Sequence, residues 1–480
     1  MFTLKLYTKP GLPAQLLDHL RTPLYRNGYA LILGSGATSA LGLVYWALAA
    51  RYYTADVVGI GSALISALAL LAGVAMLSLT GVLVRFTPLA GGNTARLITA
   101  AYAISLVVAL LVGWGFCHFA GAWSPKFSFL REERGWLVAF VGATMAWCIF
   151  ALQDSALTGL RQSLWIPLEN TIFAAVKIVL LVLFAQGNPT WGIFAAWMIP
   201  LLISLLPVNI LIFRYLIPQH VQPQGQQAGG LALQAVVRYM AGNYPGTLFY
   251  LASTTLLPLL VTQQLGARAN AYFYMPWMMA NALLQVALQM STSLTVEAVT
   301  DQSRLASYAY RTFLQSARLL APAVALLVGG APLILALFGA DYASEGALLL
   351  RLLAVATLPN LVVMLYIGLA RVKNSIGNII LVQGAQCILL LSLSYLWLPT
   401  AGITAVGWAF LVSQSLVAGG VLCTPLRPIV LHGHRTYLTN QPTNETQVNM
   451  RSRSEVFQER GTTFSTRGAN TAPFLEDGTH

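Results

Sequence analysis

Long uncharged apolar runs constrain this chain more than any other feature of its sequence. Residues 97–120, 191–213 and 400–422 are clear examples. Each is longer than the ~20 residues that an α-helix needs to cross ~30 Å of hydrocarbon. A buried helix of a soluble protein explains one such run, but not a dozen in succession. Only 9% of the 480 residues are charged, too few for a soluble surface of this size. The sequence therefore predicts an all-α polytopic membrane protein.

The apolar runs define twelve predicted spans, which place both termini on the same side of the membrane. The spans cover 27–50, 57–84, 97–120, 136–158, 163–185, 191–213, 243–265, 270–298, 314–339, 346–370, 375–397 and 400–424.

Lysine and arginine are distributed unevenly between the two sides. The side that carries the termini has 20 of them and the opposite side has 5, while Lys177 and Arg351 lie within spans. Short cytoplasmic loops are enriched in these residues, so we expect both termini in the cytoplasm and the spans in the inner (plasma) membrane. The basic residues are scattered singly, so the net charge of +12 does not indicate nucleic-acid binding.

Breaks in the apolar pattern divide the chain into five segments. Residues 1–26 form a cytoplasmic N-terminal segment, and 27–213 and 243–424 form two halves of six spans each. The connection at 214–242 is rich in Pro, Gly and Gln and is predicted to be a cytoplasmic linker. The polar end at 425–480 is predicted to be a disordered cytoplasmic tail.

The two halves also resemble each other weakly. The first opens at Asn27-Gly28-Tyr29 and the second at Asn243-Tyr244. An Ala-Arg pair, Ala50-Arg51 and Ala267-Arg268, follows at a similar distance in each half. With an even number of spans per half, this repeat is parallel.

The sequence contains none of the motifs that commonly support catalysis or bind a cofactor. It has no Gly-rich phosphate loop and no Cys-x-x-Cys pair, and its four cysteines fall in or beside apolar runs. The longest predicted outer loop, 121–134, is short for a domain that holds an acceptor. We therefore expect neither an enzyme nor a bound metal or cofactor.

Polar side chains form stripes on two consecutive spans. Four lie at intervals of four, three and four residues, and four more at intervals of four, four and three, which places each set on one helix face. One reading is hydrogen bonding between packed helices; the other is a hydrophilic cavity, favoured because two consecutive spans share the pattern. The stripes are Asn243, Thr247, Tyr250 and Thr254, and Asn281, Gln285, Gln289 and Thr292.

Ionisable residues within the spans are the other candidates for a binding site, because each is costly in hydrocarbon. Lys177 is the mid-span cation, and Asn170 lies two turns earlier on the same helix face. Either Lys177 faces a cavity and binds substrate, or it pairs with Asp154 or Glu169. Those two carboxylates are candidates for an ion pair or for coupling to an ion. The predicted substrate-binding set is Lys177, Asn170, Asn243, Thr247, Tyr250, Asn281, Gln285 and Gln289.

Two segments resemble a known family. The first joins Asn27-Gly28-Tyr29, a helix rich in small residues, to Ala49–Gly59 (AARYYTADVVG). The second is Leu337–Ala343 (LFGADYA) followed by Leu350–Ala354 (LRLLA). Both are similar to bacterial polysaccharide flippases, a branch of the multidrug/oligosaccharidyl-lipid/polysaccharide exporter superfamily. The resemblance extends diffusely over residues 26–425.

The resemblance implies a fold of two six-helix lobes around a central cleft, like that of multidrug and toxin extrusion (MATE) transporters. It implies alternating access that flips a lipid-linked oligosaccharide, carried on undecaprenyl diphosphate, for cell-surface polysaccharide or lipopolysaccharide biosynthesis. Partners would then be a polysaccharide polymerase and glycosyltransferases. Family members bind the diphosphate with basic cleft residues, but no arginine of this sequence matches them clearly. The alternatives are a cation-coupled multidrug exporter of the same fold and, less favoured, a membrane-embedded polysaccharide-assembly enzyme.

The distribution of basic residues yields a topological prediction. A single cysteine placed in the linker at 214–230 should react with a membrane-impermeant maleimide only after the membrane is permeabilised, because this segment is expected in the cytoplasm. Rapid labelling from outside intact cells would contradict the orientation.

Overall fold

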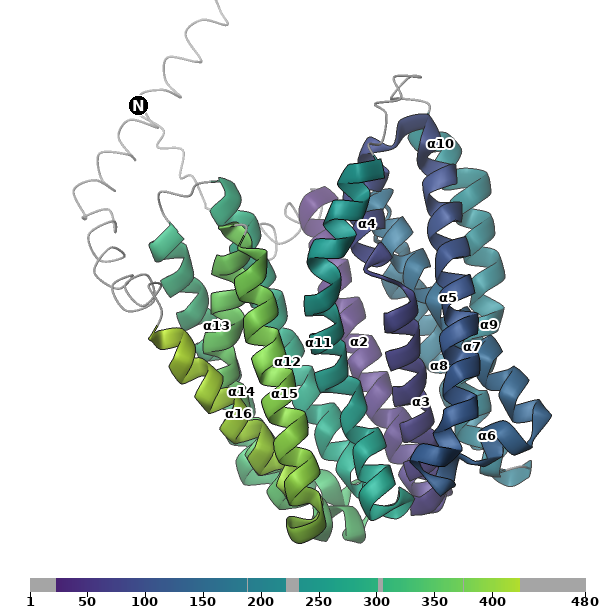
Figure 1. The fold of residues 1–480 in the computed structure, drawn as a ribbon, viewed down its shortest axis with the longest axis vertical. Coiled ribbons are helices and arrows are strands. Elements are labelled where there is room, and N and C mark those ends of the chain that lie inside the picture. The colour runs from purple at the N-terminus through teal and green to yellow at the C-terminus, as the bar shows by residue number, and fades with distance from the viewer. Residues whose placement is uncertain (1–22, 188, 222–232, 301–304, 374, 424–480) are drawn as a thin grey trace, which may run out of the picture.

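The computed structural model describes residues 23–187, 189–221, 233–300, 305–373 and 375–423. Most of the predicted N-terminal segment, much of the linker and the predicted tail lie outside these ranges. The described residues form a bundle of long helices (Figure 1).

The first half contains five long helices, a broken one and several short ones. In chain order they are α2 (Pro23–Tyr52), α3 (Ala55–Ala75), α4 (Leu79–Phe86), η1 (Thr87–Leu89), η2 (Gly91–Asn93), α5 (Thr94–Trp123), η3 (Pro125–Phe127), α6 (Phe129–Glu132), α7 (Arg134–Gly159), α8 (Trp165–Gly187), α9 (Pro189–Ile210), the π-helical η4 (Leu211–Leu216) and α10 (Ile217–Val221).

The second half contains six long helices. They are α11 (Leu233–Leu265), α12 (Ala267–Thr300), α13 (Leu305–Ala336), α14 (Ala340–Val372), α15 (Ile376–Ala401) and α16 (Thr404–Leu422). The linker predicted at 214–242 is helical at both ends, because η4 and α10 continue to Val221 and α11 begins at Leu233.

Each predicted span coincides with a helix or, in one case, with a helix pair. Ten described helical segments are long and apolar enough to cross a membrane. The two other long helices, α2 and α12, are not among these ten, although their lengths of 30 and 34 residues are comparable with those of the ten. In α12, the polar stripe Asn281–Gln285–Gln289 lowers the average hydropathy. Together these helices make the predicted all-α polytopic fold.

The second predicted span, 57–84, is interrupted in the structure. α3 ends at Ala75, and Leu77 and Ser78 adopt left-handed backbone angles before α4 begins. Side chains from the other half lie at this break: the Tyr244 hydroxyl donates to the Val74 carbonyl at 2.9 Å. Non-helical backbone at membrane depth is tolerated where protein satisfies its polar groups. The break therefore depends on a tertiary contact that an apolar run does not reveal.

The helices form two lobes that pack against each other. In Figure 1, α3–α10 lie on the right and α12–α16 on the left, with α2 of the first lobe and α11 of the second between them. Each lobe has apolar clusters of its own, such as the one around Cys148 in the first and the one around Trp277 in the second. A further cluster joins side chains of both lobes, including Trp46, Met275 and Phe338.

The lobes are sealed together at one end of the bundle. A Cβ atom on Gly59 of α3 would lie 1.7 Å from the Ala267 carbonyl oxygen of α12, so only glycine permits this approach. Asn270 of α12 is fully buried, and its side-chain nitrogen donates to the Gly59 carbonyl at 2.8 Å and to Ser62 Oγ at 3.0 Å. Arg51 adds a bond from Nε to the Leu337 carbonyl at 3.2 Å.

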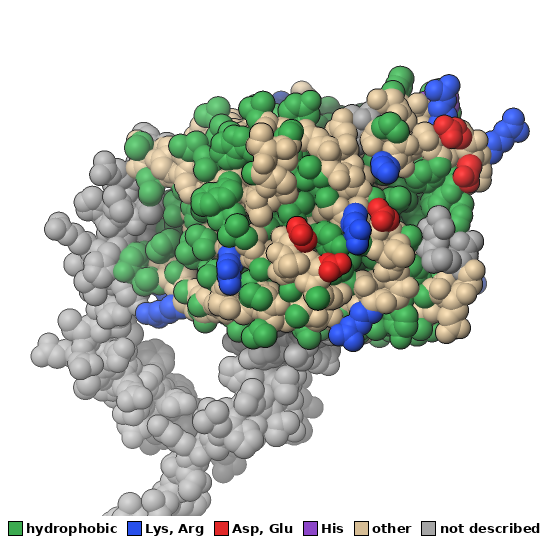
Figure 2. Space-filling view, turned by 90° about the horizontal axis from the view of Figure 1, so that it is seen from below, with side chains coloured by type: hydrophobic (Ala, Val, Ile, Leu, Met, Phe, Trp, Pro, Cys, Tyr) green, Lys and Arg blue, Asp and Glu red, His purple; other side chains and the backbone are tan. Residues whose placement is uncertain are grey.

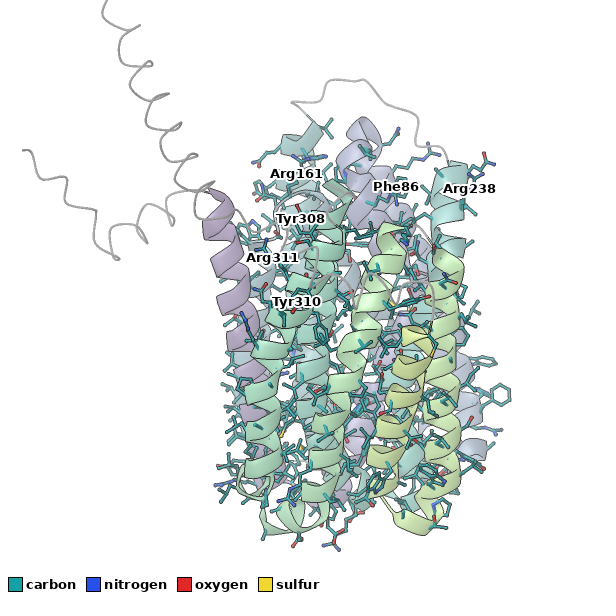
Figure 3. All side chains as sticks on the ribbon, turned by 90° about the vertical axis from the view of Figure 1, so that its left-hand side faces the viewer. Phe86, Arg161, Arg238, Tyr308, Tyr310 and Arg311 are labelled. Atoms are coloured by element: carbon teal, nitrogen blue, oxygen red, sulfur yellow. The ribbon has the colours of Figure 1, made fainter. Side chains whose placement is uncertain are left out.

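The sealed end carries the loops that the charge distribution assigns to the outside, and we call it the outer end. Seen from this end, the surface has both acidic and basic side chains among apolar ones (Figure 2). The opposite end, which carries Arg161 and Arg238, is the inner end (Figure 3).

The α3–α12 contact generates the second prediction. Gly59→Ala should weaken the outer seal, since overpacking of this kind costs about 1–3 kcal/mol, or roughly a 5- to 150-fold shift in equilibrium. The reporter is a second substitution, Ala271→Cys, at a position that is fully buried in the joint cluster. In the Gly59→Ala background, this reporter thiol should react faster with an impermeant maleimide added from the outer side.

Gly42→Ala is the matched control, because a Cβ atom at Gly42 meets nothing within 4 Å. Equal labelling rates of the reporter thiol in the two glycine variants would show that the α3–α12 approach does not hold the outer end closed.

Candidate functional site

An aromatic residue between two arginines lies where the lobes meet at the inner end. The Tyr239 ring of α11 lies 5.1 Å from Arg85 Cζ of α4, and its hydroxyl would lie 2.8 Å from a Cβ atom on Gly81. Arg371 of α14 interacts electrostatically with the same tyrosine. Both arginines are exposed, and no described carboxylate forms an ion pair with either. We call Arg85, Tyr239 and Arg371 the inner basic cluster.

The predicted stripe on α11 continues from this cluster towards the bundle centre. Asn243 and Thr247 are exposed, and each hydrogen-bonds the backbone carbonyl four residues earlier, at 2.9 and 3.1 Å. Thr247 also accepts from Ser78 Oγ at 3.4 Å, at the break between α3 and α4. This part of the stripe therefore faces the other lobe and keeps accessible polar atoms.

Tyr250 of the same stripe lies deeper and borders two cavities inside the second lobe. One, of about 150 Å³, is lined by Asn243, Thr247, Tyr250, Arg371 and Gln383 among others. The other, of about 30 Å³, lies between Tyr250 and three further amide side chains, Asn360, Gln386 and Gln414.

The predicted stripe on α12 has a different environment. Asn281 Nδ2 donates to the Trp277 carbonyl at 3.0 Å, and the Trp277 indole donates to the Thr254 carbonyl at 3.1 Å. Gln285 and Gln289 are exposed. Asn281 therefore bonds within its own helix and not to a neighbouring one, while the two glutamines expose their amides at the surface of α12.

Lys177 lies in an aromatic box within the first lobe. Its Nζ is 3.8 Å from the Trp197 ring centroid, 4.8 Å from that of Tyr45 and 5.2 Å from that of Phe173. The side chain is 6% exposed, and no ion pair with Asp154, Glu169 or any other described carboxylate is formed. Ring faces replace the anion that a buried cation would otherwise need.

The two carboxylates form a separate polar group nearer the inner end. Asp154 of α7 accepts a hydrogen bond from Asn170 of α8, and it interacts electrostatically with Glu169. Glu169 is 8% exposed and lines an apolar groove of about 470 Å³ between α8 and α9. Glu169 and Lys177 are eight residues apart on α8, so ~12 Å of helix separates their Cα atoms.

Sequence reasoning overlooked several residues of this arrangement. Arg85 and Arg371 both lie at the ends of predicted spans, where a basic residue indicates only the topology of the chain. The amides Asn360, Gln383, Gln386 and Gln414 interrupt apolar spans singly or in pairs, and the spacing of Gln383 and Gln386 was the available signal. Neither the charges at span ends nor the spacing of the glutamines shows which helices pack against each other.

Comparison with known proteins identifies the fold. No protein-family model and no curated protein matches the sequence. Among solved structures, an inward-facing multidrug resistance MATE family transporter of the MOP superfamily is similar, with a TM-score of 0.64 at 12% identity over 84% of this chain and 95% of that one. An outward-facing MATE transporter has a TM-score of 0.58 at 13% identity over 88% and 98%.

A third similar structure is a MOP superfamily transporter from Pyrococcus furiosus, described as having a binding pocket of reversed polarity. Its TM-score is 0.54 at 14% identity, over 88% of this chain and 95% of that one. The chain therefore has the two-lobed MATE fold that the sequence resemblance implied.

The aromatic box around Lys177 generates the third prediction. Lys177→Met keeps the apolar stem and removes the charge, and it should leave the folded protein intact or slightly more stable, by about 1 kcal/mol. A mid-span lysine costs about 2.5–3.5 kcal/mol on insertion scales, and desolvated cation–π contacts return about 2 kcal/mol. Thermal unfolding of the purified variant measures the change, with the exposed Lys373→Met as control. A large loss of stability would instead show that Lys177 neutralises a carboxylate in the folded protein.

Proposed function

We propose that this chain flips a lipid-linked oligosaccharide, carried on a polyprenyl diphosphate, from the inner to the outer leaflet by alternating access. The lobes are sealed at the outer end, and the inner basic cluster lies where they meet at the opposite end. The substrate class is an amphiphile whose head is anionic and rich in hydroxyl groups.

The inner basic cluster is the observation that carries this proposal. Arg85 belongs to one lobe and Arg371 to the other, and both remain exposed without a described carboxylate partner. Guanidinium groups bind phosphate oxygens in a planar, often bidentate geometry. A diphosphate held between them would bridge the two lobes, so its binding would be linked to their relative position.

The substrate chemistry explains why further polar groups follow at greater depth. A diphosphate and sugars cannot cross ~30 Å of hydrocarbon without a polar path for the head. Asn243, Thr247 and Tyr250 supply hydrogen-bonding groups beyond the arginines, and Gln285 and Gln289 supply exposed amides on α12. Lys177 would act deeper still, once Trp197 and Tyr45 move away from its ammonium group.

A cation-coupled multidrug exporter is the second candidate, and one observation favours it. Asp154 and Glu169 form a buried acidic group that no described lysine or arginine neutralises, beside a largely apolar groove. Such a group is suited to exchange protons or to bind a lipophilic cation. In the proposed flippase, the same pair would couple transport to an ion.

Neutralising the inner basic cluster tests the proposed function. Arg85→Gln and Arg371→Gln should each slow flipping of a polyprenyl diphosphate that carries a fluorescent saccharide by about tenfold. This follows because hydrogen bonds to charged groups contribute ~1.5–3 kcal/mol. The measurement is the rate at which the fluorophore becomes accessible to an impermeant quencher in proteoliposomes.

Arg96→Gln is the matched control, since Arg96 is another exposed arginine at the inner end. Wild-type rates in both cluster variants would reject diphosphate binding at this place. If the lipid is not flipped at all, while wild-type vesicles expel ethidium and Glu169→Gln vesicles do not, the multidrug function is the correct one.

A further inference from the structure

The second lobe contains a polar passage that leads from the inner basic cluster into its interior. The cavity of about 150 Å³ and the deeper one of about 30 Å³ share four lining residues, Tyr250, Leu288, Met364 and Gln383. The deeper cavity therefore continues the larger one, which we call the mouth cavity. Arg371 lines only the mouth cavity.

Small residues of α11 allow α15 to bring its amides into this passage. A Cβ atom on Gly246 would lie 2.6 Å from Gln383 Oε1, and one on Gly242 would lie 3.2 Å from Ile376 Cδ1. Any larger residue at Gly246 displaces the Gln383 side chain. The passage thus depends on the packing of α11 against α15.

Buried amides define the chemistry of the deeper cavity. Gln414 Oε1 accepts from Gln386 Nε2 at 2.6 Å and from Asn360 Nδ2 at 3.1 Å. Asn360 is 2% exposed, and its Oδ1 has no hydrogen-bond partner among the described residues. An unpaired buried amide oxygen is costly, so this acceptor favours a hydrogen-bond donor in the cavity.

The lining of the deeper cavity favours a neutral donor over an ion. None of its lining residues is charged, and Ser253, Thr254 and Tyr250 add hydroxyl groups to the amides. A volume of about 30 Å³ admits one or two water molecules or one hydroxymethyl group, but no complete sugar ring. A sugar ring would occupy the mouth cavity, with one of its substituents reaching into the deeper cavity.

From this arrangement we infer that the second lobe reads the phosphate-proximal sugar of the substrate. Arg371 binds the phosphate at the mouth, the ring lies beside Tyr250 and Gln383, and a ring substituent reaches Asn360. The inference rests on the proposed function for the identity of the anion. It adds that specificity lies in the first sugar and that the second lobe, not the lobe interface, supplies it.

Binding to a panel of lipids tests the inference. Each probe is a short polyprenyl diphosphate bearing one monosaccharide: a hexose, an N-acetylhexosamine or a 6-deoxyhexose, with the sugar-free diphosphate as reference. Wild-type protein in nanodiscs should prefer at least one sugar over the reference by about five- to tenfold, which corresponds to one net neutral hydrogen bond.

Two variants distinguish the contribution of the sugar to binding affinity from that of the phosphate. Gln383→Met keeps the side-chain length, and it should bring all four lipids to the affinity of the sugar-free reference. Arg371→Gln should weaken all four lipids by a similar factor. Gln162→Met, an exposed amide beside α8, should leave the wild-type preferences unchanged.

The free hexose 1-phosphate distinguishes a soluble ligand from a lipid-linked one. The hexose 1-phosphate should bind more weakly than the lipid, and the Gln383→Met variant should reduce its affinity as it does that of the lipid. Equal wild-type affinity for all four lipids, or preferences that survive in Gln383→Met, would overturn the sugar-reading site while leaving the proposed flippase intact. Failure of every lipid and of the sugar phosphate to bind would overturn both.

Discussion

The contact of α3 with α12 at Gly59 determines how the two lobes sit, and the rest of the arrangement follows from it. Glycine lets the Ala267 carbonyl approach to a distance that any side chain would block. Asn270 then bonds across the interface, so one buried amide satisfies backbone that close packing would otherwise isolate. Lobes joined in this way at the outer end bring the inner basic cluster together where they meet at the inner end.

The inner end has contacts of a different kind. There α11 lies against α3 and α4 through tyrosines, with the Tyr244 hydroxyl on a carbonyl beside the helix break and the Tyr239 ring beside Arg85. Phenolic hydroxyls and ring faces exchange partners at lower cost than a desolvated asparagine. A phosphate that draws Arg85 and Arg371 together would compete directly with these contacts. In the proposed function, binding of the diphosphate at this end would therefore be linked to movement of the lobes through the same residues.

Charge is separated between the lobes in a way that bears on the substrate. The first lobe holds Lys177 in its aromatic box and the acidic pair of Asp154 on α7 and Glu169 on α8. Glu169 lies about two helical turns from Lys177. The second holds neutral amides behind a single arginine. A phosphorylated sugar, as in the proposed flippase substrate, would bind both the arginine and the amides of the second lobe. The acidic pair then remains available for coupling, in either proposed function.

The sequence by itself determined the class of fold. Apolar runs of spanning length and their number require a helical membrane bundle, because hydrocarbon leaves unpaired backbone no other partner. The polar character of α11, the mid-span position of Lys177 and the division into two six-helix halves also follow from the order of residues along the chain.

Tertiary structure alone decided which of these features meet. The apolar run 57–84 contains no proline, yet it breaks at Leu77 and Ser78 because α11 supplies partners there. Lys177 and Glu169 lie on one helix but do not pair, since Trp197 and Tyr45 occupy the space around the ammonium group. Arg371 and Gln383, separated by a turn in the chain, come to line one cavity. Helical periodicity specifies the face on which a side chain lies, but only the packing of helices distant in sequence specifies what that face meets.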